Sequence, residues 1–140
     1  MRYENTWNPE TGVSECIIYD KNLKFVGKAH CHPDDMDFAS ERTGGYIAET
    51  RAVLARLRHK RDNVLRPQVK SLMVFYKDLQ NRWDFNPDHQ EVGYLIQRIN
   101  ELNHELAELE QDIRLEQTYL YDYIHNKDIM YKKIRKANAQ

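Results

Sequence analysis

The hydrophobic positions in the second half of the chain repeat with the spacing of a helix. Seven of them alternate steps of three and four residues: Val92, Leu95, Ile99, Leu102, Leu106, Leu109 and Ile113. This alternation places side chains on one face of a coiled-coil helix. Glu116 follows in the same register, the step length shifts near residues 120–127, and the stripe continues to Ile134. We predict a helix over residues 87–136, with Asn86 as its N-cap and Pro87 at its first position.

A second apolar stripe predicts another helix over residues 46–83. Its members are separated by threes, fours and their sums: Ile47, Leu54, Leu57, Leu65, Leu72, Phe75 and Leu79. Pro67 lies within this stretch and predicts a kink or a short break, because proline lacks the backbone donor of a helix interior. Gly44-Gly45 predicts a break before the helix, and residues 84–88 predict the turn that follows it.

The first third of the chain has the pattern of β-structure instead. Residues 14–19 and 23–31 are predicted as strands, joined by a turn at residues 20–22, with Phe25, Gly27, Ala29 and Cys31 on one side of the second strand. Residues 1–12 are polar and contain turn signals. A lone β-hairpin is marginal in water, so it must pack against a helix or another copy.

These elements predict an α+β protein that is mostly α. The N-terminal β-hairpin or small antiparallel sheet forms a head over residues 1–43, which ends in an acidic loop. Residues 44–140 form a long antiparallel helical hairpin with coiled-coil character. At 140 residues we expect one domain overall.

The distribution of charge supports antiparallel pairing of the two helices. Residues 51–70 carry seven bases against Asp62 alone, and residues 100–119 carry six acids against Arg114 alone. Folding the chain at residue 85 places position n opposite position 170 − n, so the two segments face each other. The same rule sets the bases of residues 127–136 opposite the acids of residues 34–41. A swapped antiparallel dimer would satisfy the same pattern.

The bulk properties narrow the classes of partner and compartment. The net charge is −1, which gives neither the basic excess of a nucleic-acid binder nor the acidic excess of a DNA mimic. No apolar run approaches the ~20 residues of a membrane span. Cys16 and Cys31 belong to no CxxC pattern and no signal peptide precedes them. We expect a cytoplasmic protein with reduced thiols and no membrane association.

One short run resembles a metal or nucleophile site. The run His30-Cys31-His32-Pro33-Asp34-Asp35 contains suitable ligand types. No second ligand cluster or phosphate-cradling glycine loop accompanies it, and a strand end with a structural cysteine explains the same residues. We therefore expect no catalytic residues, no metal and no cofactor, and interpret the chain as a binding protein rather than an enzyme.

Two regions are candidates for ligand binding. Tyrosines at 119, 121, 123 and 131 lie among basic residues near the C-terminus, a combination that suits stacking on a base and holding its phosphate. The same tyrosines suit a protein interface, or covering the β-hairpin. In the basic run, Arg51 and Arg58 share a helix face and suit an anion, whereas pairing with the acidic helix is the plainer explanation. The candidate ligand-binding residues are Tyr123, Asn126, Lys132, Arg135, Lys136, Arg51 and Arg58.

A set of N-terminal motifs resembles small proteins of bacteriophages that infect Gram-positive hosts. The motifs are Trp7-Asn8-Pro9, Thr11-Gly12, Phe25-Val26-Gly27-Lys28-Ala29, His32-Pro33-Asp34-Asp35, Gly44 and Ile47-Ala48-Glu49-Thr50-Arg51-Ala52. The plan of a β head and paired helices is similar to that of the Thoeris anti-defence family. The motif resemblance covers the N-terminal third, and the remainder is similar in architecture alone.

That resemblance implies a sponge, which binds a cyclic nucleotide immune signal between protomers of a homodimer or higher oligomer without cleaving it. Lys and Arg would hold phosphates, Tyr would stack on adenine, and Asn126 would read a base edge. Two other functions fit the architecture. One is a protein-directed inhibitor of a host defence protein, similar to an anti-CRISPR protein, and the other is a structural coiled-coil component of a phage.

Overall fold

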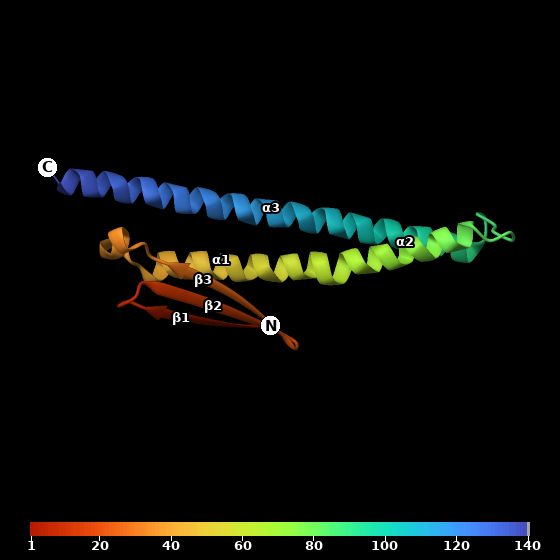
Figure 1. Ribbon diagram of the computed structural model, residues 1–140, viewed down its shortest axis with the longest axis horizontal. Helices are drawn as coiled ribbons and strands as arrows, with labels where there is room; N and C mark the ends of the chain where they lie inside the picture. Colours follow the sequence, from red (N-terminus) through yellow and green to blue (C-terminus); the bar gives the residue numbers. More distant parts are fainter. Residues whose placement is uncertain (140) are drawn as a thin grey trace. The chain divides into compact units, whose positions relative to one another are not determined.

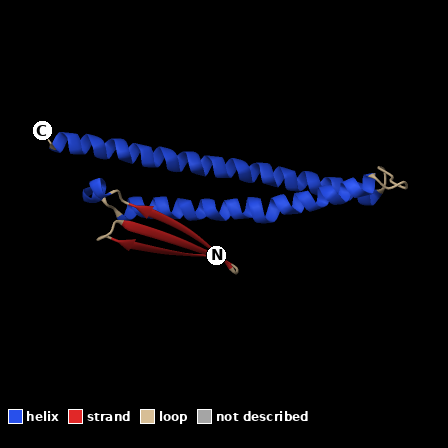
Figure 2. Ribbon diagram, viewed as in Figure 1, coloured by secondary structure: helices blue, strands red, loops and turns tan. Residues whose placement is uncertain are grey.

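The computed structural model describes residues 1–139, apart from the side chains of Pro33 and Asp34. Helices account for 68% of the chain, and a three-stranded antiparallel sheet precedes them (Figures 1 and 2). The prediction of a mostly helical α+β protein with an N-terminal antiparallel sheet is therefore confirmed.

The sheet is a meander of β1 (Arg2–Asn8), β2 (Val13–Asp20) and β3 (Leu23–His30), with β2 in the centre. The predicted hairpin is confirmed, because Asp20 pairs with Leu23 and the two residues between them form the turn. Lys21 has a positive φ of 56° there, as such tight turns require. The turn signals of residues 1–12 are confirmed at residues 9–12, but the strand before them was not predicted. Residues 2–8 form an edge strand whose two faces are largely exposed, so it lacks the apolar alternation that reveals a strand.

One face of the sheet packs on α1 (Glu41–His59) and forms the core of this region. Alternate residues of β2 and β3 are buried, among them Cys16, Ile18 and Phe25. Gly27 permits the close approach of the helix, because a Cβ built there would lie 2.0 Å from the Ala48 carbonyl oxygen. The hairpin thus gains its stability from a helix, one of the two means predicted from its sequence.

The helix starts at Glu41, five residues earlier than predicted, and Gly44-Gly45 lies inside it. The prediction of a break at these glycines was wrong. A Cβ at Gly44 would lie 2.2 Å from the Ser14 Oγ, so this glycine allows the helix to lie against the sheet. At the start of the helix, the Thr43 backbone N–H donates to the Ser40 Oγ over 3.3 Å.

The predicted irregularity near Pro67 occurs, but it precedes the proline. A π-helical segment, η2 (Lys60–Leu65), joins α1 to α2 (Arg66–Gln80), and Pro67 sits in the first turn of α2. Pro67 has no backbone N–H to donate to the helical turn before it, and the π-helical segment lies at that turn. The buried stripe of α2 includes Val69, whereas Phe75 is 50% exposed. Placing Phe75 on the stripe was wrong, and Tyr76 is the half-buried residue at that level.

The last helix, α3 (Gln90–Asn138), begins later than predicted. The Asn86 side chain accepts the Asp88 N–H over 3.0 Å and so organises the preceding turn rather than capping the helix. His89 occupies the capping position, where its Nδ1 accepts the Glu91 N–H over 3.2 Å. The predicted stripe is confirmed from Val92 to Leu120, whose positions are buried or half-buried, with Glu116 half-buried among them. Its predicted continuation to Ile134 was wrong, because Ile134 is 37% exposed and Arg135 is the half-buried residue at that level.

The chain divides into two compact units. Unit 1 comprises Met1–Arg56 with Arg114–Gln140, and unit 2 comprises Leu57–Ile113. Within unit 2, bases of residues 51–70 pair with acids of residues 100–119, as predicted for the segments: Arg66 with Glu110 at 3.0 Å and Lys60 with Glu105 at 3.5 Å. The partners lie six and five residues from the positions that the 170 − n rule gives.

Within unit 1, Arg135 pairs with Asp35, as the 170 − n rule predicts. The basic run does not pair with α3 throughout, however. Arg51 donates to the Lys28 carbonyl oxygen over 2.7 Å, and Arg56 pairs with Asp20 at 2.9 Å, so both bind the sheet. The sheet offers these arginines oxygen acceptors, which a rule based on helix pairing does not include.

Candidate functional site

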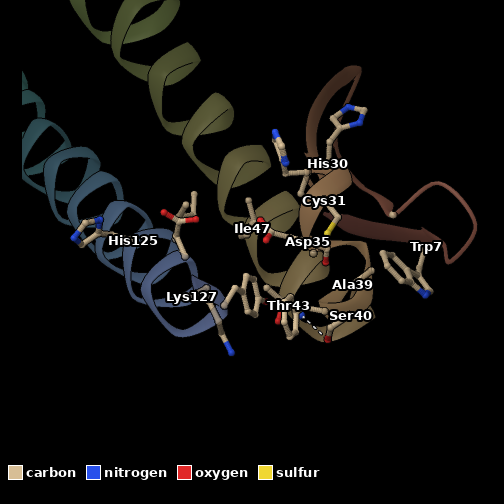
Figure 3. Close-up of a pocket in the computed structure, with 18 of the residues that line it drawn as sticks. Trp7, His30, Cys31, Asp35, Ala39, Ser40, Thr43, Ile47, His125 and Lys127 are labelled. Carbon is tan, nitrogen blue, oxygen red and sulfur yellow. Dashed lines mark hydrogen bonds between the residues drawn. The ribbon is translucent and has the colours of Figure 1, made fainter. Parts of the chain in front are cut away.

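Unit 1 contains a pocket of about 400 Å³. Its walls come from the ends of the sheet, from the segment between β3 and α1, from the first turns of α1 and from α3. Figure 3 shows Trp7 on the sheet side, Lys127 and His125 on the side of α3, and Cys31 and Asp35 between them. The lining residues are Trp7, Gly12, Ala29, His30, Cys31, His32, Asp35, Phe38, Ala39, Ser40, Thr43, Gly44, Ile47, Tyr121, Ile124, His125, Lys127, Asp128 and Tyr131.

Aromatic and aliphatic side chains make up much of this wall. The rings of Phe38, from η1 (Pro33–Phe38), and Tyr131 stack with centroids 4.6 Å apart and planes 3° from parallel. Burial raises the pKa of the Tyr131 phenol, and its hydrogen bond with Thr43 opposes that rise only in part. Tyr131 therefore stays neutral near pH 7. It offers the pocket a flat apolar ring and a hydroxyl group rather than a charge.

The two acids of the wall are each bonded to a base. Asp35 accepts a hydrogen bond from Arg135, and Asp128 pairs with Lys132 at 3.1 Å. Lys127 contributes a cationic group to the wall, which also contains the imidazole rings of His30, His32 and His125. The Lys127 Nζ lies 5.6 Å from the centre of the Tyr123 ring. Because the carboxylates are already paired, the electrostatics favour an anionic group near Lys127.

Cys31 is held as a neutral thiol. Its Sγ donates to the Asp35 carbonyl oxygen over 3.1 Å. Burial raises the pKa of the Cys31 thiol, and the nearby Asp35 charge raises it further. A thiol acts as a nucleophile or metal ligand in its thiolate form, which these two effects disfavour. Over residues 1–139, apart from the side chains of Pro33 and Asp34, the structure contains no cluster of three or more residues that could hold a metal ion.

The pocket wall includes none of the seven ligand-binding residues predicted from sequence. Arg135 and Lys132 are engaged with Asp35 and Asp128. Tyr123 packs against Tyr46 with ring centroids 4.4 Å apart. Asn126 and Lys136 are exposed on α3. Arg51 binds the Lys28 carbonyl, and Arg58, on an exposed position, belongs to unit 2.

The sequence reasoning missed the residues that do form the wall. Trp7 lies on β1, which was not predicted as a strand. Tyr121 and Tyr131 were in the predicted aromatic cluster but not among the selected residues. Phe38 and Tyr131, whose rings stack, lie opposite each other by the 170 − n rule to within one residue. That correspondence was the sequence signal available for a site on this part of the chain.

Comparison with family models, with curated protein sequences and with solved structures finds no match to the chain. Among residues 1–139, no helix combines the length and the apolar character that crossing a membrane requires.

Proposed function

We propose that this protein binds a nucleotide in the pocket of unit 1 and sequesters it without cleaving it. The observation that carries the proposal is the composition of the wall. Aromatic rings and Lys127 meet in one cavity, and the two acids that would repel a phosphate are paired with bases. Aromatic faces stack on bases with little sequence preference, and a lysine provides the charge that holds a phosphate.

The size of the pocket favours a small ligand. Small-molecule pockets commonly occupy about 300–1,000 Å³, and a volume of about 400 Å³ lies near the lower limit of that range. A cyclic mononucleotide is the member of the cyclic nucleotide class that suits this volume best. The base would stack on Tyr121 or Trp7, and the phosphodiester would lie near Lys127.

Capture without cleavage is consistent with the chemistry of the wall. Phosphodiester hydrolysis needs an activated water or nucleophile, and in many enzymes metal ions to stabilise the charge that develops. Cys31 is held as a thiol, and both acids are engaged in ion pairs. A sponge of this kind would act in the cytoplasm of a phage-infected bacterium. This is the anti-defence function that the resemblance to the Thoeris anti-defence family implies.

The helical regions support a coiled-coil-like, antiparallel hairpin as the frame of such a protein. The alternating stripe of α3 is buried, and the ion pairs of unit 2 join α3 to the helices before it. One point differs from the sponge architecture inferred from sequence. The pocket is formed by a single chain, so in this proposal a second protomer is not needed to complete it.

Native mass spectrometry and calorimetry with 3′,5′-cyclic AMP, cyclic di-AMP and AMP test the proposal. One cyclic nucleotide should bind per chain and emerge unmodified when the protein is denatured. Lys127→Gln should weaken binding at least about 10-fold, the loss expected for one hydrogen bond to a charged group. Lys133→Gln is the matched control, because Lys133 is exposed on the same helix and does not line the pocket.

A third variant separates the pocket from the site predicted by sequence. Lys136→Glu should leave binding within about 3-fold of wild type if the pocket is the site, because Lys136 is exposed on α3 and does not line the pocket. Loss of binding in Lys136→Glu with no effect of Lys127→Gln would place the ligand on the exposed C-terminal face. No uptake of any nucleotide would reject the sponge and favour a protein-directed inhibitor.

A further inference from the structure

Unit 2 has an apolar groove with a basic rim that no part of the nucleotide proposal uses. Its volume is about 400 Å³, and Val69, Met73, Val74 and Leu106 form its apolar part. Met73 and Val74 are 53% and 54% exposed, which is high for neighbouring apolar side chains in one helix. The rim consists of Arg66, Lys70 and Lys77.

The cations of this rim are not all neutralised. Arg66 is bonded to Asp62 at 2.8 Å and to Glu110 at 3.0 Å. Lys70 and Lys77 are exposed and form no ion pair within the described part of the chain. An apolar floor beside these two cations favours an occupant that combines a large apolar or aromatic group with acids.

The turn of the same unit has that combination. Trp83 is 98% exposed, and the connection between α2 and α3, residues 81–89, carries Asp84 and Asp88 after Trp83 and Arg82 before it. Local contacts hold the turn in place without covering the Trp83 indole. The Phe85 N–H donates to the Arg82 carbonyl oxygen over 3.2 Å, and the Phe85 ring packs back on Tyr76 with centroids 6.3 Å apart. Phe85 therefore anchors the turn to α2, while the Trp83 side chain stays almost fully exposed.

We propose that two copies of this chain dimerise by inserting Trp83 of each into the groove of the other. The indole would contact Met73 and Val74, and Asp84 and Asp88 would approach Lys70 and Lys77 of the second copy. Lysine beside an aromatic face adds a cation–π attraction to the burial of the ring. Groove and turn lie in the same unit, and in the proposed dimer the exchange is reciprocal about a two-fold axis, which closes the assembly at two chains.

Sedimentation velocity over a concentration series of the full chain tests this dimer. The wild-type protein should show a reversible monomer–dimer equilibrium that weakens as salt is added. Trp83→Ala should raise the dimer dissociation constant about 30-fold, the effect of losing one interface hot spot. Trp83 is almost fully exposed, so this change should leave the helical circular dichroism unchanged. Phe75→Ala is the matched control, since Phe75 is an exposed aromatic of α2 that does not line the groove.

Charge exchange identifies the contact. The pair Lys70→Glu with Lys77→Glu should dissociate the dimer, as should the pair Asp84→Lys with Asp88→Lys. Combining all four changes should restore it, because the complementary charges are then reversed together. A wild-type protein that is monomeric up to about 100 µM, a concentration at which weak specific dimers assemble, would overturn the proposal. A dimer unaffected by Trp83→Ala, or one that the four combined changes fail to restore, would overturn it equally. Nucleotide uptake by unit 1 is a separate readout and does not depend on any of these results.

Discussion

Replacing Gly27 with alanine should destabilise the contact between the sheet and α1 far more than its single methyl group implies. The added Cβ would lie 2.0 Å from the Ala48 carbonyl oxygen and 2.4 Å from the Ala52 nitrogen. Both are backbone atoms, so no side-chain rotation relieves the clash, and the helix itself must move away. That movement opens the packed core over Cys16 and Phe25, which are 0% and 8% exposed.

Overpacking of a core typically costs about 1–3 kcal/mol, and the rigid backbone contacts place Gly27→Ala near the upper value, at about 3 kcal/mol. With a urea m-value of about 1.5 kcal/mol/M, the unfolding midpoint should fall by about 2 M. Circular dichroism during urea titration measures this shift.

The matched control is Gly45→Ala, in α1 itself. No atom lies within 4 Å of a Cβ at Gly45, so the substitution should stabilise the helix by about 0.5–1 kcal/mol. If the midpoint of Gly27→Ala were within about 0.3 M of wild type, well inside the predicted shift, close packing of α1 on β3 would be refuted.

Three further predictions concern buried polar groups of unit 1. Ser14→Ala should raise the free energy of unfolding by about 1 kcal/mol in the same titration, because the Ser14 Oγ is buried with no hydrogen-bond partner among the described residues. Arg135→Met should lower it by about 1–2 kcal/mol, since the change leaves the 14%-exposed Asp35 side chain without its ion-pair partner, and adding Asp35→Leu should recover part of the loss. An unchanged unfolding midpoint in the single Arg135 variant would count against that pair. The pKa of Cys31 is raised above its ordinary value of 9.0, so the folded protein keeps this proton to higher pH than the unfolded chain does. The resulting stability is full below pH 9.0 and declines as the pH rises above it, and thiol labelling of the native protein should be slow at pH 8, slowest at the fully buried Cys16.

The elements with strong periodicity were predictable from sequence, and those held by specific close contacts were not. The stripe of α3 and the β2–β3 hairpin follow repeats of 3.6 and 2 residues, which report the buried face directly. Gly44-Gly45 was interpreted as a break because glycine weakens a helix. For Gly44 the reason is different. Its role is tertiary, since it lies against Ser14 of a strand thirty residues earlier, and no local pattern encodes that contact.

The pocket was less predictable than the fold because its wall draws on segments that are distant in sequence. Charge and aromatic composition directed attention to residues 119–136, and α3 does contribute one side of the wall from that region. Composition could not decide which face of the helix turns inward. The burial stripe decides it: past Ile124 the half-buried positions are Lys127, Asp128, Tyr131 and Arg135 rather than Lys132 and Lys136.

This choice of face determines the proposed chemistry. Arg135, on the inner face, forms an ion pair with Asp35, whereas Lys127 lines the cavity with its Nζ near the Tyr123 ring. A cation that is ion-paired with a carboxylate attracts a phosphate less strongly, so Arg135 is the weaker candidate ligand although it lies on the inner face. Lys127→Gln should therefore reduce nucleotide affinity with little effect on the free energy of unfolding, whereas Arg135→Met should chiefly reduce the free energy of unfolding. Measuring both quantities on both variants distinguishes a lysine that binds the ligand from an arginine that holds the wall.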